Sequence, residues 1–203
     1  MSKWIYSKSV PEKLYLACSG GVDSIAVAHI LSQWRDVTLC HFGHNDGVSH
    51  LERSTVEHLA NRLGLPLIIK DSELSLVERN KEAEWRKDRY EWFHTLSEPV
   101  VTAHTLNDAV EWYLMTCLRG RGEYLPYQNK NVIRPFLLTT KAELTSHAME
   151  HGLHWWEDPG NHDASFSLRS KVRSSLLPTA VACEPGLFSM VRKNLIRKIK
   201  DEP

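Results

Sequence analysis

Apolar runs alternate with amphipathic segments along most of this chain. Residues 14–17 form a short apolar run that is typical of a buried strand. After Gly21, apolar residues recur at helical spacing: Val22, Ile25, Ala26, Ile30, Leu31 and Trp34. Residues 36–42 repeat the strand pattern, residues 51–63 repeat the helical one, and a third apolar run begins at Leu65. This order predicts a βαβαβ unit with short connections and parallel strands.

The second half of the chain continues the alternation less regularly. Residues 76–96 are charged and aromatic and predict a long helix, and residues 99–104 predict a fourth strand followed by another helix. Residues 119–131 are expected to form a long flexible loop, residues 131–136 a short fifth strand, and residues 140–151 a further helix. The predicted fold class is α/β, with a doubly wound, mainly five-stranded parallel sheet that carries helices on both faces.

Length and composition favour a single domain. The chain has 203 residues with 42% hydrophobic content, which is enough for one well-formed core. No apolar stretch is long enough to cross a membrane, and the first residues do not resemble a signal peptide. We therefore expect a soluble, cytoplasmic protein.

Charge and cysteine content indicate no particular partner. Basic and acidic residues number 25 each, so net charge is no argument for nucleic-acid binding, although basic residues crowd the last third. The four cysteines are widely scattered, which favours buried thiols over a disulfide framework or a metal site.

The segment Ser19-Gly20-Gly21-Val22-Asp23-Ser24 joins the first strand to the first helix. Amide groups at a helix N-terminus attract anions, so this loop predicts a phosphate site. It lacks the lysine of a Walker motif and the spaced glycines of a dinucleotide fingerprint. Asp23 would repel a triphosphate unless Mg²⁺ bridged them, so the acid favours a metal-bound nucleotide. The alternative is a turn that merely caps the helix.

Polar residues also follow other strands of the predicted sheet, in residues 41–46 and 104–111. Ligands of such sheets bind outside the carboxyl ends of the strands, where the strand order reverses. Asp108 and Glu111 are three residues apart and share a helix face, where two like charges favour a cation between them. That cation is Mg²⁺ or a substrate ammonium, unless both acids only complement the helix dipole. His104 is a candidate phosphate contact or proton carrier, or simply a hydrogen-bonded residue.

Six sequence blocks together resemble the tRNA(Ile)-lysidine synthetase family of PP-loop ATP pyrophosphatases, and the resemblance covers nearly the whole chain. In chain order they are the loop Ser19-Gly20-Gly21-Val22-Asp23-Ser24, Asn80-x-Glu82-Ala83-x-x-Arg86-x-x-Arg89-Tyr90, Ala103-His104-x-x-x-Asp108-x-x-Glu111, Arg119-Gly120-x-Gly122, Arg134-Pro135 and Asp158-Pro159-x-Asn161-x-Asp163-x-x-Phe166-x-x-Arg169-x-x-x-Arg173. Six blocks in one order are far more specific than any one of them. The resemblance implies an adenine nucleotide alpha hydrolase-like fold.

The resemblance also implies a reaction. Family members use ATP and Mg²⁺ to adenylate the C2 oxygen of the wobble cytidine in an isoleucine tRNA with a CAU anticodon. The amine of free L-lysine then displaces AMP, so tRNA and lysine are the implied substrates of a ligase that forms a carbon–nitrogen bond.

Site roles follow by the same resemblance. The implied ATP-binding residues are Ser19, Gly20, Gly21, Val22, Asp23, Ser24 and His44, with Asp23 also placed near the metal. Lysine is assigned to Asp108 and Glu111, and the tRNA or the intermediate to Glu82, Arg86 and Arg89. The implied catalytic residues are Asp23, His104, Asp108, Arg169 and Arg173, of which the two arginines could stabilise phosphate or the adenylated intermediate.

The chain departs from the family pattern at several positions. Thr105 and Asn107 replace a histidine and an aspartate, Gly43 precedes His44 where an aspartate is common, and Ser170 replaces an asparagine. A nucleotide-binding protein with weakened catalysis therefore stays an alternative, as does another PP-loop enzyme of the tRNA thiolase type.

We expect residues 1–178 to form the catalytic domain and residues 179–203 a basic helical tail. The family's usual C-terminal tRNA-binding domains are expected to be absent. A second copy of the chain or a partner protein could then supply further tRNA contacts.

Overall fold

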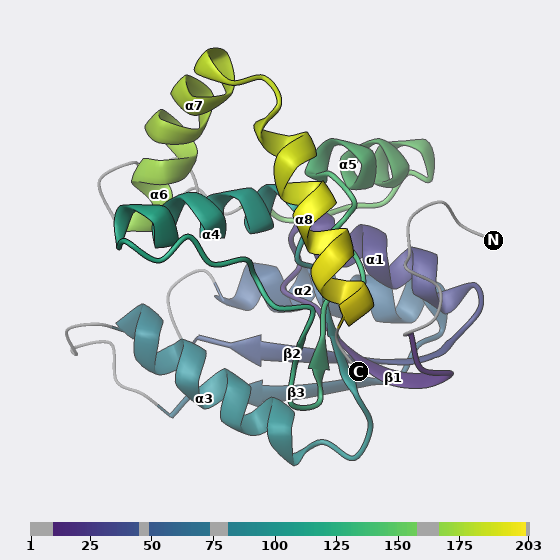
Figure 1. Cartoon of the computed structure of the whole chain (residues 1–203). Helices are drawn as coiled ribbons and strands as arrows, with labels where there is room; N and C mark the ends of the chain where they lie inside the picture. Colours follow the sequence, from purple (N-terminus) through teal and green to yellow (C-terminus); the bar gives the residue numbers. More distant parts are fainter. Residues whose placement is uncertain (1–9, 45–48, 74–80, 158–166, 202–203) are drawn as a thin grey trace.

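A computed structural model describes residues 10–44, 49–73, 81–157 and 167–201 (Figure 1). Helices and strands alternate in the first half, as the sequence predicts. The elements are β1 (Lys13–Ala17), α1 (Val22–Ser32), β2 (Asp36–Gly43), α2 (Ser49–Leu63), β3 (Leu67–Asp71), α3 (Lys81–Thr95), β4 (Val100–Thr102), α4 (Leu106–Leu118), β5 (Gln128–Asn129), β6 (Val132–Ile133), α5 (Lys141–Glu150), α6 (Leu168–Lys171), the π-helical turn η2 (Val172–Leu176), α7 (Leu177–Cys183) and α8 (Leu187–Asp201).

The sheet has the order β3-β2-β1-β4-β6-β5. Five strands are parallel, and β1 lies between β2 and β4, with Leu16 opposite Leu39 on one side and Val101 on the other. The strand order therefore reverses at β1, which places a ligand site beyond the carboxyl ends of β1 and β4. The predicted α/β class and parallel sheet are confirmed.

A sixth strand lies within residues 119–131, where the sequence pattern predicted a flexible loop. β5 has two residues and pairs antiparallel with β6, and nearby Leu125 and Tyr127 are buried. The loop prediction was wrong for this part, because a two-residue strand is too short to show an alternating pattern.

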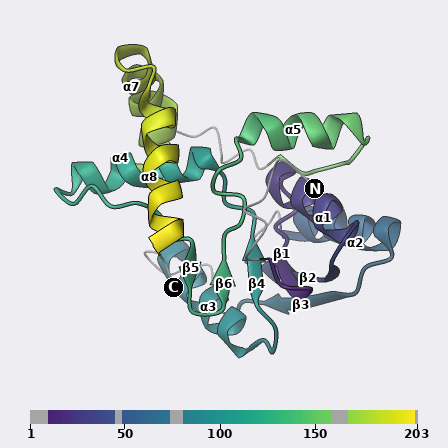
Figure 2. The same ribbon diagram turned by 45° about the vertical axis from the view of Figure 1, so that its right-hand side comes forward.

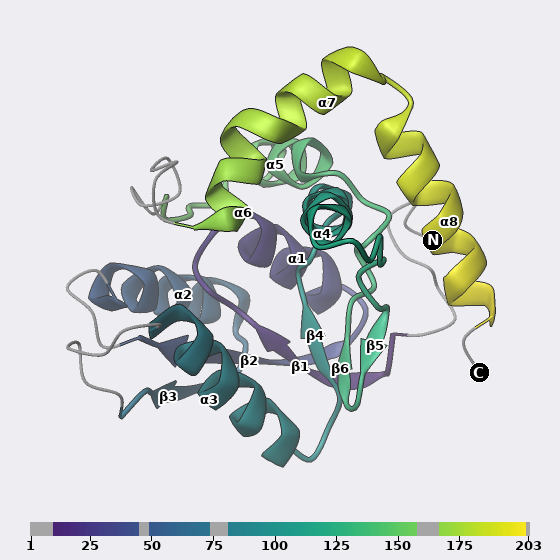
Figure 3. The same cartoon turned by 60° about the vertical axis from the view of Figure 1, so that its left-hand side comes forward.

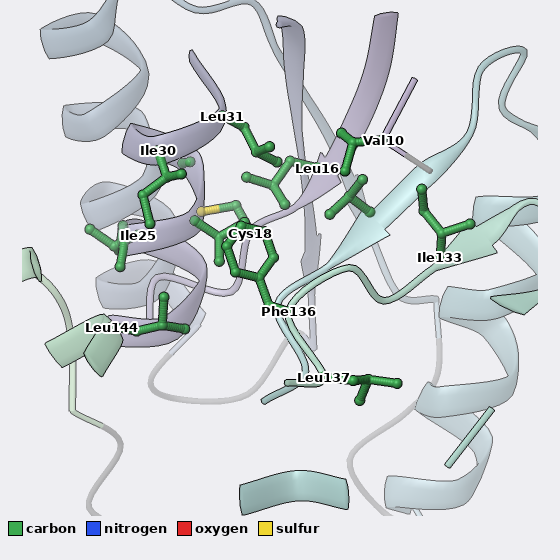
Figure 4. Close-up of a cluster of buried hydrophobic side chains, with 14 of the residues drawn as sticks. Val10, Leu16, Cys18, Ile25, Ile30, Leu31, Ile133, Phe136, Leu137 and Leu144 are labelled. Carbon is green, nitrogen blue, oxygen red and sulfur yellow. The ribbon is translucent and has the colours of Figure 1, made fainter. Parts of the chain in front are cut away.

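Helices cover both faces of the sheet, as predicted. One face carries α3, whose Phe93 packs with Cys40 and Val100 (Figure 3). The other face carries α1, and α5 packs against α1 (Figure 2). Side chains from β1, α1 and α5 gather around Phe136 in this larger core, as Figure 4 shows. Because both faces are covered, the central strands are mostly apolar, and all three residues of β4 are buried.

The last part of the chain packs onto the same core. In α8, Leu187, Val191 and Leu195 are buried, and this helix lies against α4 (Figure 2). The boundary expected between residues 178 and 179 falls inside α7. None of the helices described here is long and apolar enough to span a membrane.

Candidate active site

The loop between β1 and α1 is held by backbone contacts from two distant segments. Gly20 has φ +84°, and a Cβ there would stand 3.0 Å from the carbonyl oxygen of Glu52. The N–H of Trp156 donates to the Gly20 carbonyl at 2.9 Å. Buried Ser24 donates its hydroxyl to the Gly21 carbonyl at 2.9 Å and accepts the N–H of Ser19 at 3.2 Å. Glycine at position 20 is thus required both for its backbone conformation and for the close approach.

A cavity of about 260 Å³ opens beside this loop. Its wall includes the loop itself together with residues from β2, α3, β4 and α4. The loop residues on it are Ser19, Gly21, Asp23 and Ser24, and further lining residues are His44, Arg89, Tyr90, His104, Asp108 and Arg169. Residues from all three predicted polar segments, 19–24, 41–46 and 104–111, therefore line one cavity at the switch point. Positions 45 and 46 of the second segment lie outside the described residues.

Asp23 has the environment of a cation ligand. Its Oδ1 is buried and has no hydrogen-bond partner, while Oδ2 lies 4.0 Å from the ammonium of Lys141. Burial raises the pKa of Asp23 to about 6, against the attraction of Lys141. A carboxylate oxygen without a donor is the ligand that hard cations prefer, so the residues present fit Mg²⁺.

His104 stands between the loop and the acids of α4. Its Nδ1 is 2.8 Å from the hydroxyl of Thr102. Burial lowers the pKa of His104 to about 3, so the imidazole is neutral at physiological pH. It can exchange hydrogen bonds with a ligand without adding charge.

Asp108 is bound from both sides. One carboxylate oxygen accepts the N–H of Thr105 at 2.7 Å and its hydroxyl at 2.8 Å, and the other oxygen is bound by the guanidinium of Arg169. Burial disfavours the charged form, but His104, Arg169 and the Thr105 hydrogen bonds favour it, and together they lower the pKa of Asp108.

Glu111 binds two arginines, Arg169 and Arg173, and is 3% exposed. Its Oε2 accepts from Arg169 Nε at 2.9 Å, and its Oε1 accepts from Arg173 Nε at 2.7 Å. Arg173 makes a second hydrogen bond, from Nη2 to Oε2, at 3.0 Å. The spacing of Asp108 and Glu111 predicted Mg²⁺ or a substrate ammonium between them, whereas in this structure the cation that both acids bind is the guanidinium of Arg169.

Two departures from the family pattern have structural roles. Thr105 is the N-cap of α4 and forms a capping box with Asp108. The side-chain oxygen of Asn107 accepts the N–H of Lys141 at 2.9 Å and so caps the start of α5. Both substitutions therefore stabilise the helices that border the site.

A second cavity of about 260 Å³ adjoins the first. His104, Asp108 and Arg169 line both cavities, and Arg86 and Arg119 line the second. The two arginines assigned to the tRNA or the intermediate therefore line different cavities: Arg89 lines the loop cavity and Arg86 lines the second one. The side chain of Glu82 lies outside the described residues, as do positions 158–166 of the last motif.

Some site residues belong to the sequence motifs, or lie outside them, without a role that the sequence predicts. Tyr90 lines the loop cavity, and its hydroxyl accepts from Arg134 at 3.1 Å, while Arg134 is itself only 2% exposed and also donates to the Pro126 carbonyl at 3.0 Å. Arg134 thus positions a cavity residue as well as a strand. Lys141 reaches Asp23 only because α5 packs beside α1.

The open parallel sheet and the loop at its switch point define an α/β nucleotide-binding domain. The profile of the PP-loop domain family matches residues 2–180, and the chain belongs to this family.

Several curated relatives are named tRNA(Ile)-lysidine synthase. The relative from Shigella flexneri is 34% identical over 184 residues, which are 82% of this chain and 42% of that protein. The one from Thermus thermophilus is 32% identical over 180 residues, 82% of this chain and 35% of that protein. The Corynebacterium glutamicum relative is 32% identical over 181 residues, 86% of this chain and 57% of that protein. The matched part of the chain thus covers 35–57% of the length of these three relatives.

Solved structures confirm the fold. A U34-tRNA thiolase from Methanococcus maripaludis aligns with a TM-score of 0.73 at 18% identity, over 93% of this chain and 72% of that one. NMN synthetase from Francisella tularensis aligns with a TM-score of 0.54 at 14% identity, over 92% of this chain and 86% of that one. At these identities the likeness concerns the fold alone.

Proposed function

We propose that this chain carries the ligase activity of the tRNA(Ile)-lysidine synthetase type. It would adenylate the C2 oxygen of the wobble cytidine and join that carbon to the amine of free lysine. The observation that carries the proposal is the acid pair beside the PP-loop: Asp108 lines both cavities, and Glu111 is bound to the same guanidinium, that of Arg169. A nucleotide site needs no such pair, whereas a cationic amino-acid substrate does.

ATP would bind with its phosphates at the loop of residues 19–24, with His44 beside it. Asp23 would hold Mg²⁺ through its unpartnered oxygen, and that ion would neutralise phosphate charge as pyrophosphate leaves. In the first step the cytidine C2 oxygen forms a bond to the α-phosphorus while the bond to pyrophosphate breaks. The neutral imidazole of His104 would then hydrogen-bond the nucleotide or the base.

In the second step the neutral ε-amine of lysine attacks C2, the C2–oxygen bond to AMP breaks, and the nitrogen passes its proton to solvent. Asp108 and Glu111 would orient the lysine. Arg169 and Arg173 neutralise both acids in this structure, so a lysine ammonium must share or displace these guanidinium groups. A displaced Arg169 would remain beside the loop cavity, where it would stabilise the negative charge on AMP.

The remaining roles extend the same proposal. Arg86 and Arg89, with Glu82, would face the tRNA side, and residues 1–178 would form the catalytic unit with the basic tail of residues 179–203 packed on it. Since tRNA, lysine and ATP are substrates of cytoplasmic metabolism, we place the reaction in the cytoplasm.

The thiolase alternative has weaker support in the cysteines. Cys18 and Cys40 line the loop cavity, and burial raises the pKa of both thiols. Thiol chemistry requires the thiolate, which these environments disfavour. Cys117 and Cys183 are exposed and line neither cavity.

The test is an incubation of the full chain with MgATP, L-lysine and a CAU-anticodon tRNA, followed for pyrophosphate, AMP and a lysine-sized mass increase of the cytidine. We expect all three products. Asp108→Asn should raise the KM for lysine at least about tenfold, because a charged hydrogen-bonded contact contributes about 1.5–3 kcal/mol. Asp36→Asn, at an exposed acid outside both cavities, is the matched control.

Other outcomes would redirect the assignment. Product formation that ignores lysine but requires a sulfur donor would replace the ligase proposal with the thiolase one. MgATP binding without pyrophosphate release would leave only a nucleotide-binding protein.

A further inference from the structure

Three histidines meet on the helical layer, away from the candidate active site. They are His29 on α1 and His147 and His151 at the end of α5, and none of them lines either cavity. One nitrogen of each ring can be chosen so that all three atoms lie within 4.8 Å of one another. His29 Nδ1 and His147 Nε2 are 3.0 Å apart. Among the described histidine, cysteine and acidic side chains, this group has the spacing of metal ligands.

Hydrogen bonding orients the ring of His151. Its Nδ1 lies 2.9 Å from the backbone carbonyl oxygen of His147, which can only accept a hydrogen bond. In the neutral ring the proton is therefore on Nδ1, and Nε2 carries the lone pair. Metal-binding histidines commonly have this arrangement, in which a carbonyl fixes the tautomer and leaves the other nitrogen as the ligand.

The backbone around the cluster is held in place. Arg62 of α2 donates to the carbonyl oxygens of His151 and Gly152, at 2.9 Å and 2.6 Å. Buried Leu144 and Ala148 anchor α5 in the core beside α1. The i, i+4 spacing of His147 and His151 places both rings on one face, with centroids 4.1 Å apart. The three ligands thus come from two rigidly packed helices.

Two of the ring nitrogens already lie near the spacing that a metal imposes. His29 Nδ1 and His147 Nε2 are 3.0 Å apart, and tetrahedral zinc–nitrogen bonds of about 2.0–2.1 Å place two ligand atoms about 3.3 Å apart. To bind one ion, the nitrogens of His29 and His147 would separate by a few tenths of an ångström, and the nitrogen of His151, which lies within 4.8 Å of the other two, would move closer to them.

We propose that His29, His147 and His151 bind one Zn²⁺ ion, with solvent in the fourth position. Three imidazoles suit zinc or a similar transition metal, whereas Mg²⁺ prefers oxygen ligands. The ion joins α1 to α5 about 9–11 Å along α1 from the PP-loop, at the rise of about 1.5 Å per residue. The proposal is independent of the ligase activity, because no residue of this cluster takes part in it.

The test uses the full chain without a polyhistidine tag, stripped of metal by chelation and dialysis. Zn²⁺ is titrated by calorimetry, Co²⁺ is followed by its visible absorption, and Tm is recorded with and without Zn²⁺. We expect one high-affinity site, a tetrahedral Co²⁺ spectrum and a higher Tm with Zn²⁺. His151→Ala, at an exposed ring, should weaken binding at least about 10–100-fold and abolish the Tm increase.

Two further variants sharpen the result. His147→Ala should lose the site as well, and the Tm of each variant in chelator shows whether it folds. His58→Ala is the matched control, since His58 is an exposed histidine in ring contact with His154 outside the cluster. Zn²⁺ binding by His151→Ala and His147→Ala with the affinity of the unmodified chain would overturn the proposal. So would the absence of a Co²⁺ spectrum in the unmodified chain.

Discussion

Asp23→Asn should make the ligand-free protein more stable while it removes the metal response. The pKa of Asp23 is about 6 in the folded protein and 3.8 for an ordinary aspartate, and the side chain is 27% exposed. Each unit of difference corresponds to about 1.36 kcal/mol, so an ionised Asp23 costs the fold about 3 kcal/mol. This cost is absent below pH 3.8, grows between pH 3.8 and 6, and is complete above pH 6.

The amide that replaces the Asp23 carboxylate offsets part of this gain, because a buried polar group without a partner costs about 1–3 kcal/mol. The variant should therefore gain up to about 2 kcal/mol above pH 6, equivalent to a Tm increase of up to about 8 °C for a domain of this size. The gain should largely disappear near pH 4, because Asp23 is protonated there in the folded protein and the unfolded aspartate is only partly ionised.

The assay is thermal unfolding at pH 4 and pH 7.5, with and without MgATP. MgATP should raise the Tm of the unmodified chain and have much less effect on Asp23→Asn, with Asp36→Asn as the control for charge removal. A variant that is less stable than the unmodified chain at pH 7.5, or equally stabilised at pH 4, would refute the reasoning about burial. An undiminished MgATP response would refute the metal role.

Two further substitutions test the loop and the acid–arginine cluster. Gly20→Ala should lower the free energy of unfolding by at least about 1–2 kcal/mol and weaken MgATP binding, because its φ is +84° and the Cβ meets the Glu52 carbonyl at 3.0 Å. Both free energies are measured by urea unfolding. Gly152→Ala is the control, because Gly152 has φ +58° and open space around it, so this variant should lose only the stability that backbone strain costs. Glu111→Gln should cost about 2 kcal/mol in urea unfolding, less than the 3–5 kcal/mol of a fully buried pair because its arginine partners are 38% exposed. Glu57→Gln, in an exposed pair with Arg53, should cost at most about 1 kcal/mol, and equal losses for the two variants would contradict the burial argument.

The sequence predicted the part of the site that depends on local order. The apolar run of β1, the glycines after it and the helical spacing of α1 are neighbours along the chain, so the loop and its position at a helix N-terminus follow from the pattern alone. The parallel sheet follows from the repeated strand–helix order for the same reason. The two-residue strand β5 could not be predicted from the pattern, because its pairing with β6 is a property of the folded sheet.

What only the tertiary structure decided is which distant residues meet. Arg169 lies 61 residues from Asp108, Lys141 approaches Asp23 from another helix, and the Glu52 carbonyl limits position 20. Burial of the Asp23 carboxylate, which raises its pKa, likewise arises only once α1 is packed into the cavity wall. Spacing along a chain determines which side chains share one helix face or follow one strand. Contacts between elements, and the desolvation that changes their chemistry, depend on how those faces pack, and the sequence pattern does not contain that information.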